Sequence, residues 1–173
     1  QMLEGKGRVL MMRYESGSAS TTKREEGFLA ALAKDFPGIE VVSSDQYGGA
    51  HDSAMRVSRD LLTRFESLDG IFCPNESTTR GMLRALEGVD RVGKVRFVGF
   101  DGSPMLLDAL RAGKIHALVL QDPHRMGGLA VETLVAHLRG QKVEAKIDTG
   151  LGVATLDNLE EPNIRRLLAP LGK

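Results

Sequence analysis

The segment Val95-Arg96-Phe97-Val98-Gly99-Phe100-Asp101-Gly102-Ser103-Pro104 decides how this chain of 173 residues folds. Its first six residues have the apolar character of a buried strand, and Asp101-Gly102 then interrupts the run. Ser103 and Pro104 are typical of the cap and the first residue of a helix. In an open α/β sheet, the turn that follows a strand faces the crevice in which ligands bind. The segment therefore places Asp101 at such a crevice, unless this residue only caps the helix.

The same alternation of strand, loop and helix repeats along the chain. We expect strands at 8–14, 39–42, 70–73, 95–100 and 115–120. We expect helices at 22–36, 54–65, 78–86, 104–111 and 123–140, the first opened by a capping box of Thr22 and Glu25. A weaker β-like pattern follows at 142–155, and Pro162 opens a short terminal helix at 162–168. Five alternations predict an α/β fold with a doubly wound, mostly parallel sheet and helices on both faces.

The overall composition excludes several classes of partner. Lysine and arginine (23) balance aspartate and glutamate (23), so we expect no binding to nucleic acid or to an anionic membrane surface. The single Cys73 lies in an apolar run, where it packs as a small hydrophobic residue. Residues 1–7 lack the apolar stretch of a secretory signal, and we expect the chain to be a fragment of a longer one.

Each predicted strand delivers one polar or aromatic side chain to the loop or helix that follows it. These residues are Arg24, Tyr47, Asn75, Asp101 and Gln121. The carboxyl ends of parallel strands meet at one edge of a sheet, so we expect these side chains to lie together. Their donors and acceptors match the neighbouring hydroxyl groups of a sugar or another polyol. Taken singly, Asn75 also suits a turn or cap residue, and Gln121 a strand end.

Motifs for catalysis and for cofactors are weak. Residues 88–95 approach the phosphate-loop spacing, but Val95 replaces the Ser or Thr of that motif and the segment precedes a strand. The four histidines lack the spacing of metal ligands. Glu76 and Asp101 could form an acid–base pair, although Glu76 also suits the first turn of a helix. We therefore expect a binding protein with no metal and no cofactor, and not an enzyme.

Five short motifs carry a resemblance to a known family. They are Arg24-Glu25-Glu26-Gly27-Phe28, residues 70–75, residues 98–104, Ala112-Gly113-Lys114-Ile115, and Gln121-Asp122-Pro123 with Met126-Gly127. In this order, the chain resembles the carboxyl-terminal part of the periplasmic sugar-binding proteins of bacterial ABC importers, the ribose-binding-protein type. The resemblance implies that Arg24, Asn75, Asp101 and Gln121 bind a sugar. It also implies that Tyr47 lies near an aromatic contact to that sugar.

The resemblance also implies a division of the chain and a cellular role. Residues 1–122 would form a Rossmann-like ligand-binding lobe of a type I periplasmic binding protein. Residues 123–148 would pack on an amino-terminal lobe that this chain lacks, and residues 149–173 would form a return strand and terminal helix. The implied location is the periplasm, and the implied partners are a sugar and an ABC permease in the membrane. Without its second lobe the fragment should bind sugar weakly, and it should form a homodimer or exchange the helix at 126–138 with a second copy.

Three other functions suit the same fold. A chemoreceptor-type accessory, which passes ligand occupancy to a membrane sensor, would share every residue discussed above. Another is the effector-binding domain of a lac-repressor-type transcription regulator, which shares the two-lobed architecture. The third is an enzyme of flavodoxin-like architecture, because a fold alone does not fix a function.

Overall fold

A computed structural model describes residues 3–169, and within them a six-stranded sheet organises the fold. The strands are β1 (Gly7–Met11), β2 (Ile39–Ser43), β3 (Gly70–Phe72), β4 (Arg96–Phe100), β5 (Ala117–Leu120) and β6 (Gly152–Ala154). Their order in the sheet is β2-β1-β3-β4-β5-β6. The first five strands are parallel, and β6 runs antiparallel to β5. Residues 1–2 and 170–173, which belong to the predicted segments 1–122 and 149–173, lie outside the described residues.

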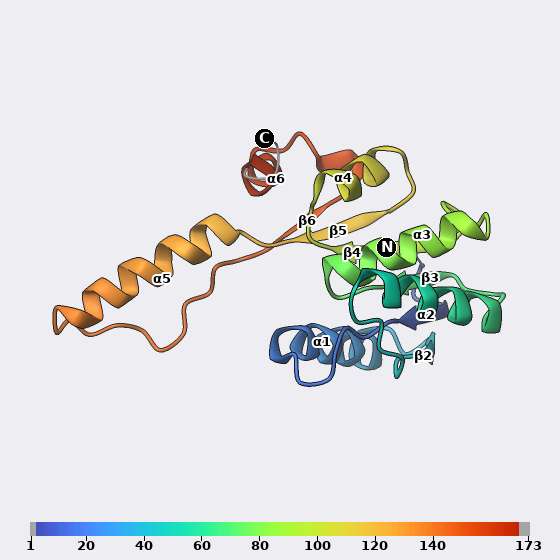
Figure 1. Cartoon of the computed structure of the whole chain (residues 1–173), viewed down its shortest axis with the longest axis horizontal. Helices are drawn as coiled ribbons and strands as arrows, with labels where there is room; N and C mark the ends of the chain where they lie inside the picture. Colours follow the sequence, from blue (N-terminus) through green and yellow to red (C-terminus); the bar gives the residue numbers. More distant parts are fainter. Residues whose placement is uncertain (1–2, 170–173) are drawn as a thin grey trace.

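Helices cover both faces of this sheet, as the alternating sequence pattern predicts (Figure 1). They are α1 (Ala19–Asp35), α2 (His51–Arg64), α3 (Glu76–Gly88), α4 (Pro104–Arg111), α5 (Pro123–Leu138), the 3-10 helix η1 (Leu156–Asn158) and α6 (Pro162–Leu168). Helix α1 packs on one face, where the Phe28 ring stacks on the Phe72 ring with centroids 4.6 Å apart. The opposite face belongs to the core formed with α2, α3 and α4.

The buried core follows the two-residue period of the strands. Leu10, Ile71, Phe97 and Leu118 point toward the α2–α4 side, and their neighbours in sequence point toward α1. Cys73 is fully buried in this core, as the apolar run around it predicts. The loops that follow these strands are therefore anchored to a well-packed apolar sheet.

Helices α2 and α3 approach each other closely at a glycine. A Cβ atom built on Gly81 would lie 2.5 Å from the Cβ of Ala54 and 2.7 Å from the backbone nitrogen of Met55. Such a distance is well below van der Waals contact, so only glycine allows this helix crossing. The close contact fixes the position of α3 against α2. Helix α3 begins at the carboxyl edge of the sheet, shortly after the end of β3.

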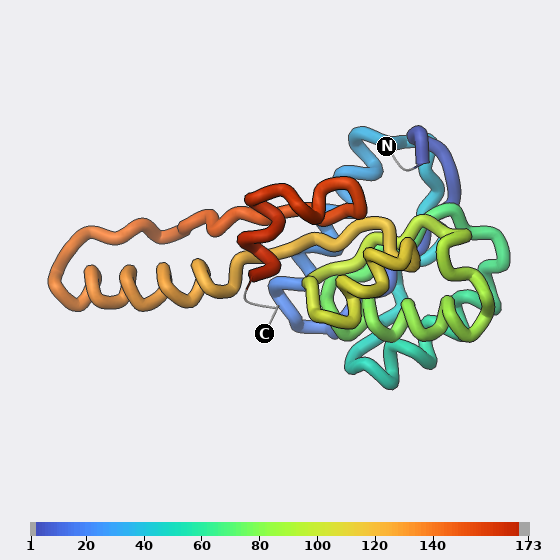
Figure 2. Tube along the Cα trace, turned by 90° about the horizontal axis from the view of Figure 1, so that it is seen from above, coloured from blue at the N-terminus to red at the C-terminus, as the bar shows by residue number. Residues whose placement is uncertain are grey.

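The segment between β5 and β6 projects away from the rest of the molecule (Figures 1 and 2). It consists of α5 and an extended return over residues 139–151, which we call the arm; the remainder is the body. None of the α5 residues is buried. At the base of the arm, β6 pairs with β5, and Arg166 of α6 forms an ion pair with Asp122.

Several sequence expectations about element boundaries differ from the structure, and three of these differences have a clear physical reason. Helix α1 begins at Ala19 and not with a capping box at Thr22, because the Glu25 carboxylate is buried in contact with Arg13 and Tyr14. The first strand ends at Met11, because the backbone then turns to pair with the loop after β2. Only Gly152–Ala154 of the β-like region 142–155 forms a strand, because the preceding residues lie in the arm without a neighbouring strand.

Candidate functional site

The carboxyl edge of the sheet brings together loops from widely separated parts of the sequence. In the sheet, β1 lies between β2 and β3. The chain passes from β1 to β2 on one side, whereas it passes from β3 to β4 on the other side. Crossovers therefore leave β1 and β3 toward opposite faces, and the crevice between their following loops is where ligands bind in open α/β sheets. Arg24 of α1 spans this crevice and donates from Nη1 to the carbonyl oxygen of Pro74 at 2.9 Å.

Three of the predicted site residues form one hydrogen-bonded row. Arg24 Nη2 donates to Gln121 Oε1 at 3.0 Å, and Gln121 Nε2 donates to Asp101 Oδ1 at 3.0 Å. The Arg24 guanidinium also stacks on the Phe100 ring, 4.0 Å from its centroid. Each member thus holds the next in a fixed orientation, which is the preorganisation a polar binding site needs.

Burial and charge act in opposite directions on Arg24. Burial lowers the pKa of its guanidinium, and the nearby Asp101 carboxylate raises it. An arginine remains protonated at any physiological pH, so the row combines a permanent positive charge with a carboxylate. Asp101 adopts a left-handed backbone conformation with φ of 66°, which directs the chain from β4 into α4. Aspartate tolerates this conformation better than most residues.

Asn75 is the N-cap of α3. Its Oδ1 accepts hydrogen bonds from the Thr78 backbone nitrogen at 3.2 Å and from the Thr78 hydroxyl at 2.6 Å. Its Nδ2 donates to the Ser77 hydroxyl at 3.1 Å. The interpretation of Asn75 as a cap is therefore confirmed, and the residue also lies directly beside Pro74, which Arg24 contacts.

Tyr47 stands apart from the other predicted residues. It lies in the loop after β2, its ring is about half exposed, and it forms an isolated bridge with Arg13. Among the described residues, no hydrogen bond or ion pair links Tyr47 to Arg24, Asp101 or Gln121.

A small hollow of about 180 Å³ opens beside the row. Asp101 and Gln121 line it together with Ser103, whose buried hydroxyl has no hydrogen-bond partner in residues 3–169. Ser103 occupies the N-cap position of α4, as its sequence context predicts, but its side chain makes no capping hydrogen bond. The Phe100 ring and the Ser103 hydroxyl are site features that sequence reasoning missed.

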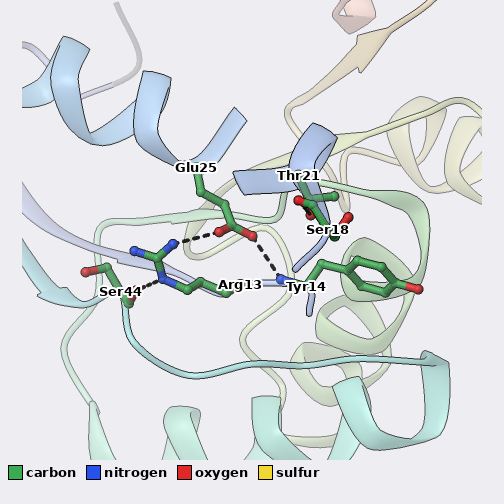
Figure 3. Close-up of polar contacts among 6 residues, drawn as sticks. All are labelled: Arg13, Tyr14, Ser18, Thr21, Glu25 and Ser44. Atoms are coloured by element: carbon green, nitrogen blue, oxygen red, sulfur yellow. Dashed lines mark hydrogen bonds and ion pairs between the residues drawn. The ribbon is translucent and has the colours of Figure 1, made fainter. Parts of the chain in front are cut away.

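A buried ion pair behind the site was also missed. Glu25 Oε2 accepts from Arg13 Nη1 at 2.7 Å (Figure 3). Glu25 shares the helical spacing of the apolar residues Phe28, Leu29 and Leu32, so it lies on the inward stripe of α1. The position of the charged Glu25 on this apolar stripe was the feature of the sequence that could have indicated a buried ion pair.

The described residues carry few other candidates for chemistry. Within residues 3–169, no group of three His, Cys, Asp or Glu side chains could hold a metal ion. No helix in this range is both long and apolar enough to cross a membrane. An apolar hollow of about 540 Å³ lies on the arm, between α5 and residues 143–149, and contains none of the residues of the row.

The fold and the polar row define a class: an α/β lobe with a fixed row of hydrogen-bonding side chains at the carboxyl edge of its sheet. The model of the periplasmic binding protein domain matches residues 1–142, and the chain belongs to this family. The chain spans about half the length of the curated relatives it matches.

Several relatives have names that specify a sugar. The chain is 32% identical over 153 residues to the ribose import binding protein RbsB of Haemophilus influenzae, covering 88% of this chain and 51% of that protein. It is 28% identical over 137 residues to the D-allose-binding periplasmic protein of Escherichia coli, covering 79% of this chain and 44% of that protein.

Solved structures share the same architecture. A carbohydrate transporter solute-binding protein from Agrobacterium radiobacter, in complex with D-arabinose, superimposes with a TM-score of 0.88 at 34% identity. The match covers 94% of this chain and 55% of that one. A solute-binding protein from Agrobacterium vitis, bound with alpha-D-tagatopyranose, also gives a TM-score of 0.88, at 28% identity, over 96% of this chain and 55% of that one. The mostly parallel, doubly wound fold predicted from the sequence is confirmed.

Proposed function

We propose that this chain is the carboxyl-terminal part of the solute-binding component of a sugar ABC transporter. In this proposal a neutral monosaccharide or polyol binds in the cleft between two lobes, of which the chain supplies one. The observation that carries the proposal is the Arg24–Gln121–Asp101 row at the sheet edge of a periplasmic binding protein domain.

The side chains of the row suit a ligand rich in hydroxyl groups. Arg24 offers donors, Asp101 offers acceptors, and the Gln121 amide offers both. Asn75 adds an amide at the start of α3, and Tyr47 supplies an aromatic ring at the rim. A hydroxyl group both donates and accepts, so adjacent hydroxyls on one sugar can satisfy the row without a net charge on the ligand.

The same proposal assigns a role to each part of the chain. Residues 1–122 form the ligand-binding lobe, and residues 123–148 pack on an amino-terminal lobe. Residues 149–173 return to the first lobe and complete its sheet. The exposed state of α5, beside a body with a continuous core, supports this division.

The relatives are periplasmic binding proteins, and we infer the same location for this protein. Its partners would be the sugar and an ABC permease in the membrane. Binding and release, without turnover of the sugar, would be its whole activity; its relatives are named for binding and import and not for a reaction.

Titration with sugars, followed by backbone NMR, tests this proposal on the chain itself. Binding by a complete site with a Kd of 1 µM corresponds to about 8 kcal/mol, and half of that free energy leaves a Kd of about 1 mM. We expect D-ribose or D-allose, at roughly ten times that Kd, to shift the amide signals of Asp101 and Gln121.

The Asp101→Asn variant should lose these shifts, because the amide replaces two acceptors with one acceptor and one donor. Asp108→Asn on the exposed side of α4 is the matched control and should titrate like the unaltered chain. A sub-micromolar Kd would contradict the view that half of the site is absent. No shift with any neutral sugar would refute the proposed function.

We also propose that the chain forms a homodimer through its arm. Val131, Leu134, Val135 and Leu138 form an exposed apolar stripe on α5. An apolar hollow of about 300 Å³ lies on the α1 face of the sheet, where Phe28 and Leu32 meet Val98 and Val119. The stripe of one copy would cover the hollow of a second copy, and two such contacts would close a symmetric dimer.

Light scattering tests the dimer. Val131→Glu should yield monomers, because it places a charge in the stripe, whereas Ala33→Glu on the exposed side of α1 should leave the dimer intact. A monomeric unaltered chain at about 100 µM, where a typical specific dimer would be formed, would contradict this arrangement.

A further inference from the structure

Glu25 is a buried carboxylate whose two oxygens both have partners. The residue is 2% exposed, Oε2 accepts from Arg13 Nη1 at 2.7 Å, and Oε1 accepts from the Tyr14 backbone nitrogen at 3.0 Å. A buried charge is costly unless it is paired and hydrogen-bonded. The pair therefore commits both residues to one geometry (Figure 3).

Arg13 extends this geometry to a second loop. Its Nε donates to the carbonyl oxygen of Ser44 at 2.6 Å. Its backbone nitrogen donates to the Gln46 carbonyl oxygen, and its own carbonyl oxygen accepts from Gly48, both at 2.8 Å. These bonds bracket Tyr47, whose ring centroid lies 6.0 Å from the Arg13 guanidinium carbon. The loop after β2 is thus held to the loop after β1 by Arg13 and also by the Gly49 backbone nitrogen, which donates to the Tyr14 carbonyl oxygen at 2.8 Å.

Glu25 is also the neighbour of Arg24 in α1. Arg24 is held by the Pro74 carbonyl oxygen and by Gln121, and Glu25 is held by Arg13 and Tyr14. Adjacent residues of one helix therefore connect α1 to opposite sides of the crevice. The bonds of Arg24 and Glu25 thus join α1 to the loops that follow β1, β3 and β5.

We propose that Arg13 and Glu25 are positioning residues that set the distance between Arg24 and Tyr47 across the binding edge, and thereby the selectivity of the site among sugar epimers. The inference rests on the proposed function for its ligand. The Arg13–Glu25 pair itself lies behind the edge and contacts the ligand only through Arg24 and Tyr47. The Arg13–Glu25 pair therefore controls the shape of the binding site beside Tyr47, and not only the affinity for the sugar.

Fluorine NMR of the chain labelled with 3-fluorotyrosine tests the geometric part. The sequence contains two tyrosines, and both adjoin the pair, since Tyr14 donates to Glu25 and Tyr47 lies in the loop that Arg13 holds. Tyr14→Phe and Tyr47→Phe assign the two signals. In Glu25→Gln, the amide has one acceptor oxygen for two donors, so either Arg13 Nη1 or the Tyr14 backbone nitrogen loses its acceptor. We expect both signals to shift.

Two further variants separate positioning from folding. Glu26→Gln removes the same charge from an exposed position of α1 and should leave both signals unchanged. Arg13→Lys keeps a positive charge beside Glu25 but loses the guanidinium Nε that bonds Ser44, so it should shift the Tyr47 signal and leave Tyr14 in place. It also provides the test if Glu25→Gln does not fold. An unchanged Tyr47 signal in Arg13→Lys would overturn the proposal.

Titration of these samples with D-ribose and D-arabinose, which differ at one carbon, tests selectivity. We expect the ratio of the two Kd values to change about threefold or more in Arg13→Lys and to stay constant in Glu26→Gln. An equal loss of affinity for both sugars would overturn the selectivity role. If the unaltered chain binds neither sugar but binds another neutral sugar, the same ratio is measured with that sugar and one of its epimers. If it binds no neutral sugar, the proposed function fails, and the fluorine signals still decide whether the pair positions Tyr47.

Discussion

Replacement of Gly81 by alanine tests the helix crossing that supports the binding edge. The added Cβ would lie 2.5 Å from Ala54 Cβ and 2.7 Å from Met55 N, both on the rigid frame of α2. Carbon atoms pack at about 3.5–4.0 Å, so α2 and α3 must separate by roughly 1 Å. Overpacking of this kind costs about 3 kcal/mol, and the better helix propensity of alanine returns about 1 kcal/mol. The expected net loss of unfolding free energy is about 2 kcal/mol.

Urea unfolding, followed by circular dichroism, measures this loss. Gly27→Ala in α1 is the matched control, because a Cβ at Gly27 would meet no atom within 4 Å. The control should gain about 1 kcal/mol from helix propensity, which leaves a gap of about 3 kcal/mol between the two variants. Equal stabilities of Gly81→Ala and Gly27→Ala would refute the reasoning, since the helix crossing would then accommodate a methyl group freely.

Two further predictions concern titratable groups in the body. Burial raises the pKa of the Cys73 thiol, so a disulfide reagent should leave the folded chain unmodified. In urea the same reagent should label one thiol per chain. Fast labelling without denaturant would contradict the burial of Cys73. Hydrogen bonds from the Arg125 backbone and from the Arg166 side chain lower the pKa of Asp122. This contribution to stability is present above the unfolded pKa of about 3.9 and is lost as the pH falls through the lower folded value. Arg166→Gln should therefore raise the midpoint pH of acid unfolding, and an unchanged midpoint would show that the ion pair contributes nothing.

Most of the fold could be predicted because its signals are local. Helices α4 and α6 begin and end at the residues predicted, since each opens with proline at its first helical position. The parallel strands follow from apolar runs stopped by glycine, asparagine or aspartate. From that alternation alone, the carboxyl ends of five strands share one edge, so the proximity of Asp101 and Gln121 was within reach of sequence reasoning.

The remaining features depend on contacts between distant residues. Glu25 fits a capping box by its spacing from Thr22 and also lies on the apolar stripe of its helix, and the contact with Arg13 decides between these two interpretations. The projection of α5 follows from the angle at which the chain leaves β5, which no local pattern encodes. Tyr47 was grouped with the site by its position after a strand, but its loop is held by Arg13 instead of by the row.

The base of the arm has a mechanical consequence for the site. Gln121, the centre of the polar row, is followed directly by Asp122, the N-cap of α5. Any rotation of α5 about this point moves the Gln121 amide relative to Asp101 and Arg24. Because energetic coupling between two events is reciprocal, a ligand that holds the Gln121 amide also favours one orientation of the arm. If the proposed function is right, a side chain that binds the sugar is therefore adjacent in sequence to the N-cap residue of α5, and binding at Gln121 would be coupled to the orientation of α5.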